Sequence, residues 1–233
     1  MAILTILLSL IPSFAWLFFF LREDIHPEPR RMIAKVFVFG ILITIPATAL
    51  QYALKGALGQ QASAQYSFIS FLLFALIEEV LKFAVVWYTV SRSEFFDEPL
   101  DAMVYMITAA LGFALVENVA VALGIDTLGG VFTALTLRFV GATLLHALSS
   151  SIVGYYWAIS LIQKNRGRFS GDFIVTMGLL LASVLHAIFN YLIISLNDAL
   201  VYPTIFLIFI AMFVFFDFEK LKVSKLAINH KSG

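Results

Sequence analysis

The sequence predicts an all-α protein whose helices cross a membrane about seven times. Of its 233 residues, 61% are hydrophobic and only 13% are charged, whereas soluble domains are about half apolar and a quarter charged. The apolar residues gather in seven runs, each long enough for a helix to cross a hydrocarbon core of about 30 Å. This pattern predicts a polytopic membrane helical bundle. The runs are 2–21, 32–54, 67–90, 101–124, 131–162, 172–196 and 200–218.

Two of these runs need separate comment. The first, 2–21, is expected to be a span and not a cleaved signal peptide, because no basic region precedes it and the charged residues Arg22, Glu23 and Asp24 follow at once. The fifth, 131–162, is too long for one crossing. We expect it to tilt, to protrude or to break near Gly141, and a break would give eight helices. Residues 1–233 are expected to form a single membrane domain.

Basic residues are concentrated in alternate loops, which predicts the orientation of the chain. The loops on the opposite side of the membrane carry only one basic residue, Lys55. By the positive-inside rule, the N-terminus is outside and the C-terminus is cytoplasmic, so we expect a multi-pass protein of the cell membrane. The cytoplasmic set consists of Arg22, Arg30, Arg31, Lys35, Arg92, Lys164, Arg166, Arg168, Lys220, Lys222, Lys225 and Lys231.

Charge and cysteine content exclude several classes of function. The formal net charge is zero, which argues against a nucleic-acid partner. The chain contains no cysteine, so it has no disulfide, no thiolate metal site and no cysteine nucleophile.

Polar residues inside the apolar runs carry most of the functional information. A charge at the centre of a bilayer costs about 2.5–3.5 kcal/mol, so these groups are expected to pair or to face the interior of the bundle. They predict a polar cavity between helices. The residues are Glu78, Glu79 and Lys82 in the third run, Glu117 and Asn118 in the fourth, Arg138 and His146 in the fifth, and His186 and Asn190 in the sixth.

Their depths in the membrane can be compared by counting from the predicted cytoplasmic ends. At about 1.5 Å per residue, the two glutamates of the third run lie about 17–18 Å deep, His186 about 21 Å, and Glu117 and His146 about 24 Å. These five groups are therefore expected to converge near mid-depth. Arg138 lies about 36 Å from its end, and we expect it to reach the outer interface and to lie outside the cluster.

The spacing of these residues along each helix indicates which of them share a helix face. Glu78 and Lys82 are four residues apart and can pair, whereas Glu79 points about 100° away from Glu78. One glutamate could thus face the cavity while its neighbour packs against Lys82 or another helix. His186 and Asn190 are also four residues apart and can point into one cavity. Each feature taken alone also fits a structural role, such as an internal ion pair or a histidine bonded between helices.

At these residues the chain resembles the PrsW family of intramembrane proteases, distant relatives of the CAAX prenyl proteases. The resemblance covers residues 67–196, which would form the catalytic core. Four motifs in order on successive spans carry it. They are Glu78-Glu79-x-x-Lys82; Asp101-x-x-x-Tyr105 with Gly112-Phe113-Ala114-x-x-Glu117-Asn118; His146 with the small residues through Gly154-Tyr155-Tyr156; and His186-x-x-x-Asn190.

The resemblance implies an endopeptidase that cuts membrane proteins, and the type member of the family acts on an anti-sigma factor. By analogy with the CAAX proteases, Glu78 and His146 would activate water, and His186 and Asn190 would hold the oxyanion. Many PrsW-like proteins carry Asp in place of Asn190, so this residue matches the CAAX pattern instead. Glu79 is the fifth catalytic candidate. The supporting candidates are Lys82, Glu117, Asn118 and Asp101.

Two alternatives remain open at the level of the sequence. The favoured mechanism uses no cofactor, but His146, His186 and one of the two glutamates of the third run form a set that could hold zinc. The runner-up function is a proton- or ion-coupled transporter, because glutamate and histidine chains also build proton relays in membranes; a non-catalytic scaffold or chaperone is a third. For a protease, the expected partners are a membrane protein or peptide substrate and the lipid bilayer.

Overall fold

The computed structural model describes residues 1–57, 67–164, 171–195 and 201–222, and these residues form helices and no strand. The prediction of an all-α fold is confirmed. The helices are α1 (Ala2–Leu21), α2 (Arg30–Ala57), α4 (Phe68–Val90), α5 (Pro99–Leu123), α6 (Leu128–Val140), α7 (Ala142–Lys164), α8 (Gly171–Ser195) and α9 (Val201–Lys222).

Six segments of the described chain are long and apolar enough to cross a membrane, with α6 and α7 counted as one. The remaining helix, α4, is 23 residues long. Every stretch of 18 residues within α4 contains Glu78, Glu79 and Lys82, whereas each of the six other segments has such a stretch with at most two charged residues. The predicted third span is therefore the one that brings charge into the bundle.

The fifth apolar run breaks at Gly141, one of the three outcomes expected from its length. Helix α6 ends at Val140 and α7 begins at Ala142. A Cβ atom on Gly141 would lie 2.8 Å from the carbonyl oxygen of Leu137, so a side chain would not fit without a shift. Non-helical backbone at membrane depth is tolerated where it is buried in protein or lines a cavity.

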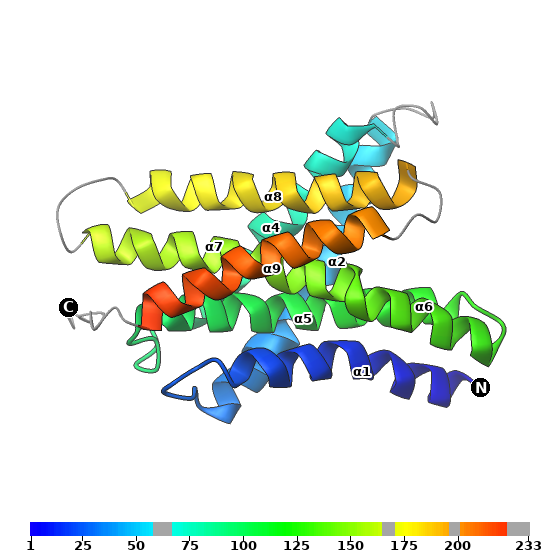
Figure 1. Ribbon diagram of the computed structural model, residues 1–233, viewed down its shortest axis with the longest axis horizontal. Coiled ribbons are helices and arrows are strands. Elements are labelled where there is room, and N and C mark those ends of the chain that lie inside the picture. The colour runs from blue at the N-terminus through cyan, green and yellow to red at the C-terminus, as the bar shows by residue number, and fades with distance from the viewer. Residues whose placement is uncertain (58–66, 165–170, 196–200, 223–233) are drawn as a thin grey trace.

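Helix α5 lies at the centre of the bundle and is buried along most of its length. Figure 1 shows α1, α5, α7 and α8 side by side in that order, and neighbouring helices in this row contact one another. Helix α2 also packs on α5. At their crossing, a Cβ atom on Gly112 would collide with the backbone of Phe37, so only glycine allows the two helices to approach this closely.

The loops with basic residues lie at the same end of the bundle. His26 in the α1–α2 loop pairs with Glu98 at 2.8 Å, and Lys222 at the end of α9 bonds Glu23 at 2.8 Å. These contacts agree with the alternating loops on which the predicted orientation rests. The basic side chains predicted after α7, and Lys225 and Lys231 after α9, lie outside the part that the structure describes. Which end faces the cytoplasm stays a prediction.

We expect single cysteines at the two ends of α5 to report this orientation. Ser93→Cys, before α5, should resist a membrane-impermeant thiol reagent in intact cells, and Asp126→Cys, after α5, should react. The chain contains no native cysteine, so the label reports only the introduced site. Disruption of the membrane should expose Ser93→Cys and serves as the control. The reverse labelling pattern in intact cells would show that the orientation is inverted.

Candidate active site

Helices α4, α7 and α8 bring four buried ionisable side chains together. Glu78 and Glu79 come from α4, His146 from α7 and His186 from α8. One nitrogen or carboxylate oxygen from each lies within 4.8 Å of the corresponding atom of every other. The imidazole rings of the two histidines are 4.9 Å apart and almost perpendicular.

Lys82 lies at the centre of this cluster. Its Nζ is 2.9 Å from Glu79 Oε1, 2.9 Å from His146 Nδ1 and 3.5 Å from Glu78 Oε2. The ammonium also lies over the ring of Phe113, 4.5 Å from its centroid. Its side chain is completely buried. The cluster therefore contains a cation that the chain itself supplies.

Glu79 is held on all sides by protein groups. Its Oε1 accepts from Lys82 and lies 3.2 Å from His186 Nδ1. Its Oε2 accepts a hydrogen bond from the hydroxyl of Ser150 at 2.7 Å. The residue has no exposed surface, so Glu79 behaves as a fixed partner of Lys82.

Glu78 is the carboxylate that faces open space. Its Oε1 accepts a hydrogen bond from Gln51 Nε2 at 2.8 Å. Its Oε2 is 3.7 Å from His146 Nδ1 and 3.8 Å from His186 Nε2, looser contacts than those of the neighbouring glutamate. This arrangement agrees with the expectation that one glutamate faces a cavity while its neighbour packs against Lys82.

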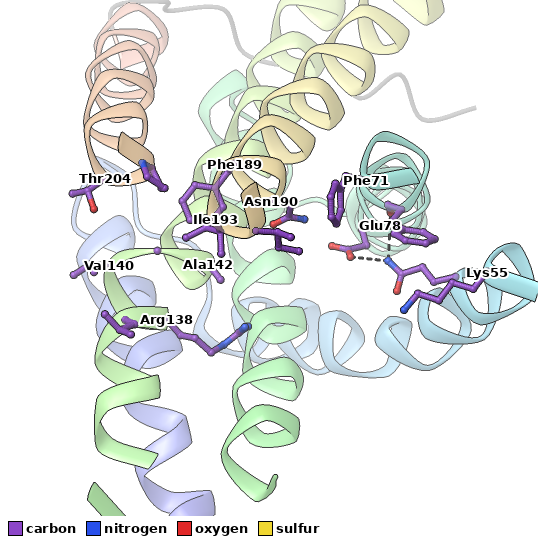
Figure 2. Close-up of a pocket in the computed structure, with 16 residues that line it drawn as sticks. Lys55, Phe71, Glu78, Arg138, Val140, Ala142, Phe189, Asn190, Ile193 and Thr204 are labelled. Atoms are coloured by element: carbon purple, nitrogen blue, oxygen red, sulfur yellow. Dashed lines mark hydrogen bonds between the residues drawn. The ribbon is translucent and has the colours of Figure 1, made fainter. Parts of the chain in front are cut away.

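The cavity has a volume of about 590 Å³ and lies between α2, α4, the α6–α7 break, α8 and the start of α9. Figure 2 shows Glu78 and Asn190 on its wall, with apolar side chains such as Phe71 and Ile193 around them. The break at Gly141 forms part of the lining. The other lining residues are Lys55, Gln51, Phe74, Leu137, Arg138, Val140, Ala142, Phe189, Ile194, Pro203 and Thr204.

A chain of polar contacts connects the cluster to α5 and α6. His146 Nε2 lies 2.9 Å from Glu117 Oε2, and Arg138 Nη2 donates to the same oxygen at 2.8 Å. Arg138 Nε donates to Asn118 Oδ1 at 2.6 Å, and Asn118 also bonds Thr143. Asn118 thus links α5 to α6 and α7, and Glu117 contacts His146 directly.

The expectation that Arg138 lies outside the cluster is wrong. The depth of Arg138 was estimated by counting residues along one straight helix that continues through Gly141. The break lets α6 leave that line, and the long guanidinium side chain reaches Glu117 instead of the membrane interface.

Asp101, expected among the supporting residues, also lies elsewhere. Its Oδ2 accepts from the backbone N–H groups of Asp97 and Glu98, so it caps the start of α5. It precedes Glu117 by about 24 Å along the same helix, at about 1.5 Å per residue. A carboxylate at the first turn of a helix is typical of a cap, and that signal was present in the sequence.

The structure adds residues that the sequence did not single out. Gln51 bonds Glu78 from α2, and Ser150 bonds Glu79 from α7. Gln51 is a polar residue within an apolar run, which was a usable signal. Ser150 belongs to a run of three serines that looked like a small polar face, and nothing in the run distinguishes the one that meets a carboxylate.

We expect Lys82→Met to destabilise the protein by about 3–5 kcal/mol, because removal of one partner leaves the buried Glu79 carboxylate uncompensated. The double variant Lys82→Met/Glu79→Gln should recover much of this loss. Unfolding of the purified protein in detergent micelles measures both. Lys55→Met is the matched control, because Lys55 is exposed and should change stability little. Equal effects of the two methionine variants would contradict a central ion pair.

Comparison with known proteins identifies the family. The family model described as "PrsW family intramembrane metalloprotease" matches residues 28–217. A "Protease PrsW" of Geobacillus kaustophilus is 31% identical over 180 residues, which cover 76% of this chain and 74% of that protein. The "Protease PrsW" of Bacillus subtilis is 29% identical over 196 residues, with 84% and 85% covered. No solved structure matches the chain.

The family model and these relatives together cover most of the chain, including every helix of the cluster. Of the three functions considered from the sequence, they support the peptidase and not the transporter or the scaffold. The chain therefore belongs to the PrsW family of intramembrane proteases and is a multi-pass membrane peptidase.

Proposed function

We propose that the protein hydrolyses peptide bonds in membrane proteins with a water molecule activated by Glu78, and that the reaction needs no metal ion. The observation that supports this is the unequal environment of the two neighbouring glutamates. Glu78 lines a cavity of about 590 Å³, whereas Glu79 is enclosed by protein. Only Glu78 can meet both a water molecule and a substrate.

Glu78 is suited to act as the general base. A base must lie within hydrogen-bond reach of the proton that it removes. Gln51 and Lys82 hold the carboxylate in place, and its position on the cavity wall leaves room for water beside it. After it takes the proton from water, the same carboxylate can return it to the leaving amine.

Glu117 is proposed to position His146. When Glu117 accepts the Nε2–H of His146, the Nδ1 atom of the ring is left as an acceptor. That atom faces the ammonium of Lys82 at 2.9 Å, which can donate to it. The imidazole is thereby fixed next to Glu78 and can assist in moving the proton.

The oxyanion role is proposed for Asn190. Its carboxamide lines the cavity on the side of Glu78, where an amide N–H can meet the developing negative charge (Figure 2). His186 was paired with Asn190 for this role by the family resemblance. Both of its ring nitrogens face glutamates, so we assign it to holding the carboxylates.

The family is described as one of metalloproteases, so the fit of a metal ion needs a test. Two histidines and two glutamates within reach of one another are a suitable donor set for zinc. However, the ammonium of Lys82 already lies between His146 Nδ1 and the carboxylates. A zinc ion bound about 2 Å from that nitrogen would lie beside a buried positive charge. We therefore propose that the residues present do not hold a resident metal ion unless Lys82 is displaced.

The charges of the cluster support the same conclusion. Three carboxylates, Glu78, Glu79 and Glu117, face two permanent cations, Lys82 and Arg138, which leaves one negative charge. One further proton makes the group neutral, whereas a divalent ion would give it a charge of +1 that a bound hydroxide would have to offset. Uncompensated charge is costly inside a membrane, so a single mobile proton suits the site better.

The proposed substrate is a membrane-embedded protein segment in the cell membrane, and the family resemblance suggests one of the anti-sigma-factor kind. Apolar side chains such as Phe71, Phe74 and Ile193 form much of the cavity wall. Such walls suit the side chains of a hydrophobic segment.

We expect Glu78→Gln to reduce cleavage by at least about 10²–10⁴-fold and Asn190→Ala by about 10²–10³-fold in kcat, with little change in stability. Cleavage of a co-reconstituted single-span membrane protein, followed by mass spectrometry, measures both. Asp126→Asn, an exposed carboxylate beyond the end of α5, is the control and should keep full activity. Full activity of Glu78→Gln would refute the assignment of the base.

We expect the purified protease to stay active after exhaustive chelation and to contain much less than one zinc ion per chain. The physical reason is that Lys82 provides the positive charge at the position where the metal would bind. Zinc content by mass spectrometry and cleavage before and after chelation test this. Stoichiometric zinc, with activity lost on chelation and restored by zinc alone, would overturn the metal-free mechanism.

A further inference from the structure

One basic side chain on the wall of the active-site cavity has no part in the proposed chemistry. Lys55 and Arg138 are the basic residues among the described residues that line this cavity. Arg138 donates to Glu117 at 2.8 Å and to Asn118 at 2.6 Å, so its charge is already paired. Lys55 lies in the last turn of α2 and is exposed. The charge of Lys55 is therefore the one that needs an explanation.

The surroundings of Lys55 supply no counter-charge. None of the ion pairs between described residues includes it. Residues 58–66, which follow α2 and lie outside the described part, contain no Asp or Glu. The Nζ atom instead lies 5.5 Å from the centroid of the Phe74 ring, within the range of a cation–π contact. Because Phe74 lines the cavity, this contact keeps the ammonium at the cavity wall.

Lys55 lies one helical turn from the residue that holds the proposed base. Gln51 and Lys55 are four residues apart on α2 and share a helix face. Gln51 Nε2 donates to Glu78 Oε1 at 2.8 Å. A rise of about 1.5 Å per residue places Lys55 about 6 Å farther along α2, toward the end of that helix. Figure 2 shows Glu78 and Lys55 on one side of the cavity and Arg138 on the other.

The cavity extends to the end of the bundle at which Lys55 lies. Four of its lining residues, one each from α2, α4, α8 and α9, lie within three residues of the helix ends there: Lys55, Phe71, Ile194 and Thr204. This end is opposite the basic loops, and the predicted topology places it outside, where basic residues are less common. A polar segment that follows the membrane span of a substrate at this end would pass Lys55 on its way to Glu78.

We propose that Lys55 binds an Asp or Glu side chain of the substrate and thereby selects the peptide bond that reaches Glu78. The inference rests on the proposed function, because it takes Glu78 as the base. Residues of an extended peptide are about 3.3 Å apart, so a separation of about 6 Å corresponds to about two residues. The flexible stem of lysine widens this range to about two to four residues. The preferred substrate has an acidic residue at that distance from the scissile bond, on the side toward the end of α2.

The rest of the cavity wall explains why such a contact is needed. Apolar side chains such as Phe71, Phe74 and Ile193 can hold a hydrophobic segment. They distinguish poorly between neighbouring positions of that segment, because one apolar side chain can replace another. A charged pair fixes the register of two partners more than it adds affinity. Lys55 can therefore set the cleavage position while the apolar wall provides the binding.

A set of single-span peptides tests this with the full-length protein in vesicles of zwitterionic phosphatidylcholine. All peptides share one apolar span and one uncharged polar segment, in which a single Asp, or Asn as its control, is moved stepwise. We expect the kcat/KM of the best Asp peptide to exceed that of its Asn control about tenfold, the range of a partly desolvated ion pair. Mass spectrometry should show that the cut moves with the Asp. Lys55→Met should cleave both peptides at the rate of the Asn control.

Two further variants separate a specific contact from general attraction. Lys55→Glu should reverse the preference, so that a peptide with Lys in place of Asp is cleaved faster. The double variant Lys55→Met/Ala53→Lys restores the charge of α2 on its opposite face, about 200° away, at an exposed position. It should not restore the preference for Asp. Restoration by this variant, or equal cleavage of Asp and Asn peptides by the wild-type protein, would overturn the proposal.

A binding measurement makes the test independent of the proposed base. Fluorescently labelled Asp peptide should bind Glu78→Gln about tenfold more tightly than its Asn control, and Glu78→Gln/Lys55→Met should bind both alike. Full cleavage by Glu78→Gln with this preference intact would refute the base and leave the role of Lys55 standing. Equal affinities for the two peptides in Glu78→Gln, or no saturable binding of either, would refute that role. So would a Lys55-dependent response to anionic phosphatidylglycerol in place of Asp, which would make Lys55 a lipid contact.

Discussion

The ammonium of Lys82 is fully buried within the helical bundle, and the arrangement of the groups around it follows from the need to satisfy it. A charge in that position is unfavourable unless other groups surround it. Glu79 supplies the opposite charge, and His146 supplies an acceptor on the far side. These partners come from α4 itself and from α7, and His186 on α8 completes the group through Glu79. The groups that contact this one cation, directly or through Glu79, therefore come from three helices, α4, α7 and α8.

The same constraint explains why two glutamates are adjacent. Successive residues on a helix point about 100° apart, so a pair of neighbours cannot occupy one environment. Glu79 turns inward and neutralises Lys82, and Glu78 turns toward the cavity. Glu79 therefore has a structural role as the partner of Lys82, and Glu78 is the carboxylate proposed to act as the base. A single glutamate would have to serve both needs, and a carboxylate fully engaged with a buried ammonium has little freedom to accept a proton.

Much of the fold could be predicted from the sequence because it depends on local patterns. The length of each apolar run sets a span, and the excessive length of 131–162 made a break near Gly141 one of three expected outcomes, the one that the structure has. The similar membrane depths estimated for the ionisable residues predicted which of them come together. The positions of Arg138 and Gln51 could not be obtained in this way. The direction of α6 relative to α7 at the break and the packing of α2 on α4 decide them, and both are set by contacts between helices that are distant in the sequence.

The position of the buried carboxylates explains how their charge is balanced. Inside the membrane no ion is available from solvent at low cost, so the carboxylates near His146 are paired with Lys82 and Arg138, which are part of the chain. Two cations leave one negative charge among Glu78, Glu79 and Glu117, which a single proton can neutralise. The ammonium of Lys82 lies between His146 Nδ1 and the Glu79 carboxylate, so the chain itself supplies the positive charge that holds these groups together.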